Sequence, residues 1–271
     1  MKKLILLAAA SALSTSASAQ TRAPDPARLK ATVEKLVRFG TRHTLSSASD
    51  PKRGIGAARR WGAAEFEKIA KGCGGCLTVE TIADRFTGPR APDGVEVVDV
   101  LAIQKGTGDP NQVVIVAGHI DSRVSDVMDA TSDAPGANDN ASGTALVIEA
   151  ARVLAGEKFD GTIVYALLSG EEQGLWGGKL LAATAKARGW QVRAMLNNDI
   201  VGNTLGQNGQ TSPTGCGCFP KASALPRMKK RRGPDGRSAG RMTGLRARSP
   251  RRSTALPRPI RRSRRSITGC R

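Results

Sequence analysis

The stretch Q-V-V-I-V-A-G-H-I-D-S, residues 112–122, joins an apolar run to a group of polar side chains. After Gln112 the next five residues are all apolar, which is typical of a strand buried on both faces of a sheet. A second run, G-T-I-V-Y-A-L-L at residues 161–168, has the same character. Because sheets buried on both faces are usually parallel and covered by helices, the two runs predict an α/β fold.

Helical patterns alternate with the apolar runs along the chain. The apolar spacing predicts helices over residues 25–40, 50–71, 142–154 and 175–187. Further strands are expected at residues 95–103 and 192–196. This alternation predicts a three-layer sandwich with a mostly parallel, mixed central sheet that is flanked by helices.

Ionisable side chains follow the ends of the expected strands or enter the next helix. These are His119, Asp121, Asp139, Glu171, Glu172 and Asp199. Ligands of such sheets bind beyond the carboxyl ends of the strands, so these side chains are expected to share one cleft. Without a partner, their mutual repulsion and desolvation would cost several kcal/mol. A bound divalent cation offsets that cost, and one imidazole with several carboxylates suits zinc or another transition ion.

The spacing within the motifs suggests separate tasks. Residues i and i+2 of an extended segment face the same side, so Asp121 can accept the second ring N–H of His119. Adjacent residues of an extended segment face opposite sides, so one of Glu171 and Glu172 can hold a metal while the other acts as a general base. Asp139 has two oxygens and could bridge two ions about 3.5–4 Å apart.

Four ordered motifs together resemble one known family. They are G-H-I-D-S (118–122), P-G-A-N-D-N-A-S-G (135–143), S-G-E-E-Q-G-L (169–175) and N-N-D-I-V-G-N (197–203). Over about residues 25–210 the chain is similar to the co-catalytic di-zinc exopeptidases, metallopeptidase family twenty-eight, of the bacterial leucyl-aminopeptidase type. The resemblance implies a peptide substrate and hydrolysis of N-terminal peptide bonds. A metallo-carboxypeptidase or an aminoacyl-cyclase relative with the same metals is the alternative enzyme.

The resemblance also implies roles for the matching residues. His119 and Asp199 would hold the first zinc, Asp139 would bridge both zinc ions, and Glu172 would hold the second. Glu171 would be the catalytic base, and Asp121 would be the catalytic partner that orients His119. The bond between Asp139 and Asn140 is typically cis in this family.

One ligand of the family is missing. Its second zinc takes a histidine from a loop well after the position of Asp199, but this chain has only two histidines, His43 and His119. His43 lies far upstream, and we interpret it as structural. The second zinc site is therefore expected to be incomplete, with impaired activity. The last strands and helices of the family also have no counterpart, so the fold is expected to be incomplete at its C-terminus.

The N-terminus has the order of a secretory signal peptide. Lys2 and Lys3 precede an apolar run over residues 4–13, and small residues end in Ala17-Ser-Ala19. We predict a signal peptide over residues 1–19 and a catalytic domain over residues 20–212; a short N-terminal helix is the alternative. The apolar run is too short to anchor the protein in a membrane, so the mature protein, without its signal peptide, is expected to be periplasmic or secreted.

Export permits disulfides, and the chain has five cysteines. Cys73 and Cys76 lie in G-C-G-G-C, which favours a local disulfide over a redox pair, because no thioredoxin-like strand precedes it. A zinc ribbon would need a second C-x-x-C, and Cys216 and Cys218 have the wrong spacing. Cys270 would be left over.

The net charge of +19 is unevenly distributed. Residues 1–212 carry a net +2, whereas residues 213–271 carry 18 basic side chains and one acid, Asp235. Three interpretations of this segment compete. It could be the translation of a shifted reading frame of the gene, a disordered basic tail, or an unusual folded domain, and we favour the shifted frame.

Composition also bears on the class of protein. Aromatic residues make up 3% and mean hydropathy is −0.27, which excludes a polytopic membrane protein. The rival to an enzyme is a non-catalytic Arg-rich protein that binds nucleic acid or an anionic surface. Because the excess charge lies outside the expected domain, no specific nucleic acid partner is expected. The sequence does not address the oligomeric state.

Overall fold

A computed structural model describes residues 23–205 of the chain. Three predicted features lie outside these residues: the signal peptide at residues 1–19, the basic segment at residues 213–271, and the cysteines Cys216, Cys218 and Cys270. Among the residues that are described, no helix is long and apolar enough to cross a membrane.

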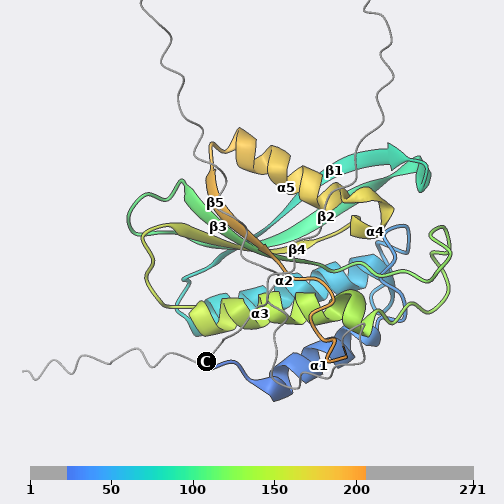
Figure 1. The fold of residues 1–271 in the computed structure, drawn as a ribbon, viewed down its shortest axis with the longest axis horizontal. Coiled ribbons are helices and arrows are strands. Elements are labelled where there is room, and N and C mark those ends of the chain that lie inside the picture. Colours follow the sequence, from blue (N-terminus) through green and yellow to red (C-terminus); the bar gives the residue numbers. More distant parts are fainter. Residues whose placement is uncertain (1–22, 206–271) are drawn as a thin grey trace, which may run out of the picture. The chain divides into compact units, whose positions relative to one another are not determined.

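A mixed sheet of five strands forms the centre of the described region (Figure 1). The strands are β1 (Thr78–Gly88), β2 (Ala91–Gln104), β3 (Gln112–His119), β4 (Thr162–Leu168) and β5 (Gln191–Asn197), in the order β1-β2-β4-β3-β5. Strand β3 runs parallel to both of its neighbours, β4 and β5, whereas the β1–β2 and β2–β4 pairs are antiparallel. The carboxyl ends of β3, β4 and β5 therefore meet at one edge of the sheet.

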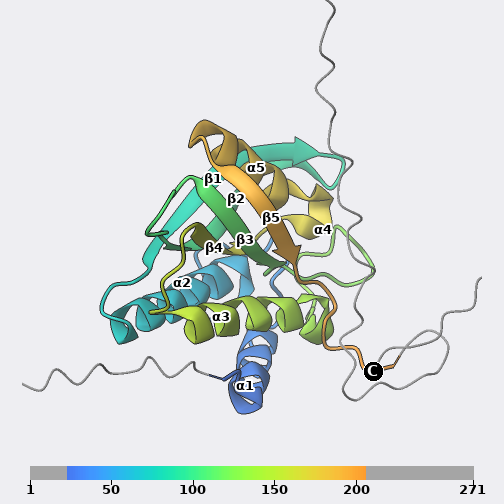
Figure 2. The ribbon, with the colours of Figure 1, turned by 60° about the vertical axis from the view of Figure 1, so that its left-hand side comes forward.

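Helices cover both faces of the sheet, as Figures 1 and 2 show. They are α1 (Pro26–Val37), α2 (Gly54–Gly72), α3 (Gly143–Leu154), the short α4 (Glu171–Gly174) and α5 (Trp176–Ala187). An irregular turn, η1 (Ala137–Ser142), precedes α3, and its residues Asp139 and Asn140 have non-helical backbone angles. Helices α2 and α3 pack on one face with α1 beyond them, and α5 packs on the other. The predicted three-layer α/β fold is confirmed, with two parallel and two antiparallel strand pairs.

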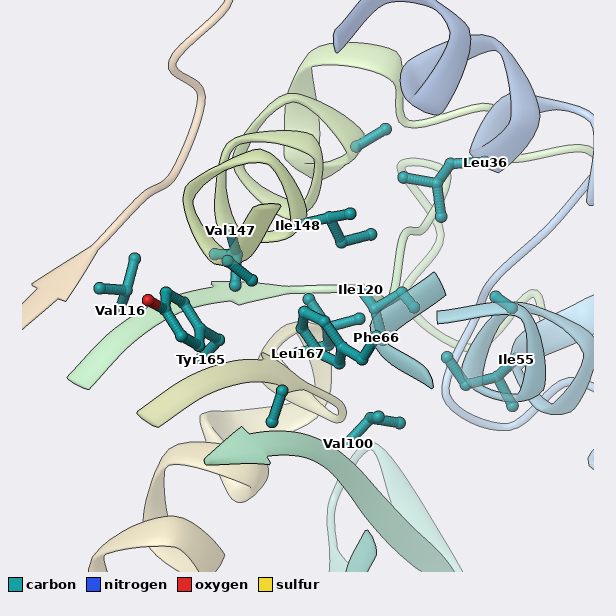
Figure 3. Close-up of a cluster of buried hydrophobic side chains, with 14 of the residues drawn as sticks. Leu36, Ile55, Phe66, Val100, Val116, Ile120, Val147, Ile148, Tyr165 and Leu167 are labelled. Atoms are coloured by element: carbon teal, nitrogen blue, oxygen red, sulfur yellow. The ribbon is translucent and has the colours of Figure 1, made fainter. Parts of the chain in front are cut away.

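The packing of β4 on both of its faces explains why its sequence is almost entirely apolar. Tyr165 and Leu167 pack with Phe66 of α2 and Val147 of α3, and Figure 3 shows these side chains between the helices and the sheet. The intervening Val164, Ala166 and Leu168 pack on the other face with Leu181 of α5. Because both faces are covered, the strand has no solvent-facing side on which polar residues would be favoured.

Helix α2 and strand β1 differ from the sequence expectation. Helix α2 begins at Gly54 rather than at Asp50, because the Asp50 carboxylate accepts hydrogen bonds from the backbone N–H groups of Lys52 and Arg53 and closes a turn there. Strand β1 was not predicted. Its residues are mostly exposed or half-buried and include several charged side chains, so the segment lacks a continuous apolar signal.

The buried face of α3 also differs from the expected one. Of the apolar residues expected along this helix, Ile148 is buried, whereas Leu146, Val153 and Leu154 are only half-buried. The other buried apolar side chains are those of Val147 and of the small residues Ala145 and Ala151. Alanines at these positions allow α3 to approach the sheet closely, which a pattern of large apolar residues does not reveal.

The disulfide between Cys73 and Cys76 is present, with an S–S distance of 2.07 Å. It closes the turn between α2 and β1, and the prediction of a local pair is confirmed. At the other end of the described region, β5 pairs with β3 alone and all its residues are exposed. The β5 edge thus stays uncovered within residues 23–205.

Candidate metal centre

His119 and Asp199 meet because β3 and β5 are parallel and adjacent. Ala117 of β3 is the register partner of Asn197, and the backbone N–H of Asn198 donates to the carbonyl of Ala117 at 2.8 Å. The chain leaving β5 therefore passes the end of β3, where the His119 side chain is buried. The His119 Nε2 atom lies 3.6 Å from Asp199 Oδ1.

Asp139 reaches the same point from the segment η1. Its Oδ1 lies 3.2 Å from His119 Nε2. The bond from Asp139 to Asn140 is cis, as the resemblance implied. The buried Asn140 side chain donates to the carbonyl of Asn198 at 2.8 Å and accepts from the N–H of Gly143 at 2.9 Å. Asn140 thus ties η1 to the end of β5 and holds Asp139 beside Asp199.

Close backbone contact at this junction requires glycine. A Cβ at Gly143 would lie 2.1 Å from the carbonyl oxygen of Asn198, far inside van der Waals contact. The motif residues around Asp139 therefore serve to bring two chain segments together, in addition to supplying a ligand.

Asp121 links His119 to the turn that carries the two glutamates. Its fully buried carboxylate lies 3.4 Å from His119 Nδ1, and its backbone carbonyl oxygen lies 3.2 Å from the same atom, so both groups of Asp121 face the ring nitrogen that points away from Asp139. The same carboxylate accepts from the hydroxyl of Thr44 at 2.9 Å and from the backbone N–H groups of Glu171 and Glu172 at 3.3 and 3.1 Å. One carboxylate thereby fixes both the imidazole and the start of α4.

The side chains of Glu171 and Glu172 point in different directions because of a helical turn, and not because of the extended backbone that was expected. They form the first turn of α4 rather than an extended segment, so their side chains are separated by about 100° around a helix axis. The expectation of extended backbone is wrong here. Glu171 Oε2 lies 4.0 Å from His119 Nε2, whereas Glu172 Oε2 lies 2.6 Å from the Nε of Arg123. The two carboxylates still face different partners.

These atoms form two overlapping groups with the spacing of a metal site. In one, ligand atoms of His119, Asp139 and Asp199 lie within 4.8 Å of one another; in the other, those of His119, Glu171 and Glu172 do. An imidazole with two carboxylates is a ligand set that zinc accepts, so either group fits a zinc ion. The first group is the tighter one around His119 Nε2, because Asp139 and Asp199 lie 3.2 and 3.6 Å from this atom and Glu171 lies 4.0 Å away.

The electrostatics of the cluster favour a bound cation. Burial lowers the pKa of His119, but hydrogen bonds to Asp121, Asp139 and Asp199 outweigh it and raise that pKa to about 12. Burial also raises the pKa of Glu171, and the nearby Asp121, Glu172 and Asp199 add to that rise. The carboxylates therefore attract positive charge, which a proton on His119 supplies until a metal ion replaces it.

His43, the second histidine, lies apart from both groups. It is fully buried, its Nδ1 accepts from the N–H of Leu45 at 3.1 Å, and its Nε2 lies 3.1 Å from the carbonyl oxygen of Val127 and 3.0 Å from the side-chain amide nitrogen of Gln173. Both ring nitrogens are thus occupied by neighbouring polar groups, in line with the structural role predicted for it.

Arg42 was missed by the sequence reasoning although it organises the loops of the site. This fully buried side chain donates to the carbonyl oxygens of Leu36, Ile120, Pro135 and Gly136 at 2.8–3.1 Å. Burial lowers its pKa to about 10, partly offset by Asp121 and Asp139. It joins the segment before Asp139 to the segment that carries Asp121. No local pattern distinguishes a buried arginine from a solvated one.

Replacing Arg42 with Met should lower the free energy of unfolding by about 3 kcal/mol or more, because it leaves buried carbonyl groups without a donor. Urea unfolding at neutral pH measures this change. Arg38→Met is the matched control, since Arg38 lies nearby but is exposed, and its expected effect is within about 0.5 kcal/mol. A loss below about 1 kcal/mol for Arg42→Met would show that Arg42 does not organise these loops.

Part of the chain is similar to known zinc metallopeptidases. Residues 99–215 match the model of peptidase family M28. The chain is 47% identical over 195 residues to a "Probable zinc metalloprotease" of Pyricularia oryzae, which covers 70% of this chain and 38% of that protein. It is 49% identical over 186 residues to a protein of the same name from Pyrenophora teres f. teres. The chain spans about two fifths of the length of these relatives.

Solved structures share the fold at low sequence identity. A leucine aminopeptidase precursor from Bacteroides thetaiotaomicron superposes with a TM-score of 0.55 at 16% identity, covering 69% of this chain and 66% of that one.

Proposed function

Because residues 99–215 carry a domain of peptidase family M28, we propose that this chain is a zinc-dependent hydrolase of N-terminal peptide bonds. One observation carries the proposal: Asp139 and Asp199 converge on the Nε2 of His119 at 3.2 and 3.6 Å. These three residues would hold the zinc ion. The peptide substrate and the aminopeptidase reaction are inferred from the family motifs and from the fold shared with a leucine aminopeptidase precursor.

In this proposal the side chains of the site have separate roles in the reaction. A zinc ion held by His119, Asp139 and Asp199 would act as a Lewis acid, which would polarise the scissile carbonyl and make a water molecule more acidic. Glu171 accepts the proton of the attacking water and then donates a proton to the leaving amine. Asp121 holds the His119 ring in place and the start of α4 with it, so Glu171 keeps its position beside the zinc ligands.

A solved structure of a second class of enzyme superposes on this chain as well as the aminopeptidase precursor does. A glutaminyl cyclase from Bacteroides thetaiotaomicron superposes with the same TM-score of 0.55 and the same 16% identity. A cyclase relative therefore remains the alternative, and a carboxypeptidase is a further one. All three would use the same zinc ligands, so only the reaction separates them.

A substrate panel tests the proposed reaction. The zinc-loaded full chain is incubated with aminoacyl p-nitroanilides, with peptides that begin with glutamine, and with peptides blocked at the N-terminus. We expect slow release of p-nitroaniline that a chelator abolishes and added zinc restores. Cyclisation of the glutaminyl peptides, or trimming of the blocked peptides from the C-terminus, without aminoacyl hydrolysis would instead identify one of the alternatives.

The organisation of the chain is part of the proposal. Residues 1–19 direct export to the periplasm or beyond, residues 20–212 form the catalytic domain, and residues 213–271 lie outside it. The M28 match, which ends at residue 215, supports this boundary. The mass of the exported chain tests the first of these assignments, since it should lack 19 residues; retention of residues 1–19 would reject it.

A further inference from the structure

Arg123 follows the G-H-I-D-S motif directly and points into the site. Its Nε donates to Glu172 Oε2 at 2.6 Å, and its Nη1 donates to the carbonyl of Val124 at 3.1 Å. The Glu172 side chain is 9% exposed and that of Arg123 is 35% exposed. A charge-assisted bond of this length to a nearly buried carboxylate is among the stronger interactions that a side chain makes.

Glu172 is the residue that would have to hold a second metal ion together with Asp139. The carboxylate of Glu172 is already engaged by the guanidinium of Arg123. A divalent ion between Glu172 and Asp139 would face the positive charge of Arg123 at close range, and their repulsion would oppose its binding.

The chain also has no imidazole to complete a second site. Its two histidines are His43, whose ring nitrogens contact backbone groups and the Gln173 side chain, and His119, which both groups share and whose Nε2 can bind only one ion. A transition ion held by two carboxylates alone would be bound weakly. The residues present therefore fit one metal ion and do not fit a second.

We propose that the guanidinium of Arg123 takes the place of the second metal ion and limits the centre to one zinc. This inference rests on the proposed zinc site at His119, Asp139 and Asp199. Arg123 neutralises Glu172 without a metal, so the acidic cluster keeps its geometry around a single ion. Arg123 is thus a residue that determines metal stoichiometry rather than a catalytic residue.

Zinc titration of the full chain against a chromophoric chelator tests the inference without an activity assay. The wild type should bind one zinc, and Arg123→Gln should bind a second, weaker equivalent because Glu172 is released. Arg123→Lys keeps the charge and should bind one. The double variant Arg123→Gln/Glu172→Gln should return to one, because the released carboxylate is removed. Arg123→Met is a second neutral variant and should bind the same number of zinc ions as Arg123→Gln. Circular dichroism checks that each variant is folded.

Arg90 provides a matched control. Its Nη1 donates to the backbone carbonyl of Glu172 and leaves the carboxylate of Glu172 free, so Arg90→Gln should leave the stoichiometry at one. Two tight zinc ions in the wild type, or a single zinc in both neutral variants of Arg123, would overturn the inference while leaving the proposed function standing. No zinc in the wild type would reject the proposed function, and the inference with it.

Discussion

Replacing Glu171 with Gln is expected to lower kcat by about 10²–10⁴-fold, the usual contribution of a general base, with zinc binding unchanged. The Glu171 carboxylate lies 4.0 Å from His119 Nε2 but outside the group formed by His119, Asp139 and Asp199. Glutamine keeps the shape of the side chain and the backbone N–H that donates to Asp121, but it cannot accept the proton of water. Burial raises the pKa of Glu171 toward neutrality, which suits a base that takes up and returns a proton.

The adjacent glutamate gives the matched control for this variant. Glu172→Gln makes the same chemical change one residue away, where the carboxylate pairs with Arg123. Its effect on kcat should be clearly smaller. Initial rates on an aminoacyl p-nitroanilide and zinc content of the same samples give the comparison. Equal losses for the two variants, or loss of zinc from Glu171→Gln, would remove Glu171 from the role of base.

Replacing Asp121 with Asn should weaken zinc binding by about 10–100-fold, the range found when a group that orients a metal ligand is removed. The Asp121 carboxylate lies 3.4 Å from His119 Nδ1, beside the backbone carbonyl contact of 3.2 Å, and also accepts from the first two N–H groups of α4. The amide of asparagine would place an NH₂ donor where the Thr44 hydroxyl and the N–H groups of Glu171 and Glu172 also donate, so at least one of these hydrogen bonds would be lost. The imidazole and the α4 turn would both lose their alignment.

Zinc affinity is measured by competition with a chelator, for Asp121→Asn and for Thr44→Val side by side. Thr44 donates to the Asp121 carboxylate at 2.9 Å, so its replacement removes one bond but leaves the His119 partner in place. The loss for Thr44→Val should be well below that for Asp121→Asn. Unchanged affinity in Asp121→Asn would mean that the His119 ring is held by other contacts.

Structural features that depend on a short stretch of sequence could be predicted. The apolar runs at β3 and β4 identified buried strands, since every side chain of such a strand packs against one layer or the other. The rule that ligands lie beyond the carboxyl ends of strands then located His119 near Asp199, which the parallel pairing of β3 and β5 brings together.

Features that depend on burial or on long-range packing could not be predicted. The exposed strand β1 carries no apolar run, and Glu171 begins a helical turn because Asp121 accepts its N–H from a distant part of the chain. Arg42 and Arg123 look like ordinary surface arginines in the sequence. Only the fold shows that Arg42 is enclosed among four carbonyl groups and that Arg123 is paired with Glu172.

The central claim is that His119, Asp139 and Asp199 hold one zinc ion, and calorimetric titration of the full metal-free chain with zinc tests it most directly. The pKa of His119 lies well above neutrality in the metal-free chain, so zinc must displace a proton from the ring. The expected result at pH 7 is one zinc per chain with about one proton released, as measured in buffers of different ionisation enthalpy. Binding should disappear in His119→Ala. Saturable binding that persists in His119→Ala, or no binding to the wild type, would contradict the claim.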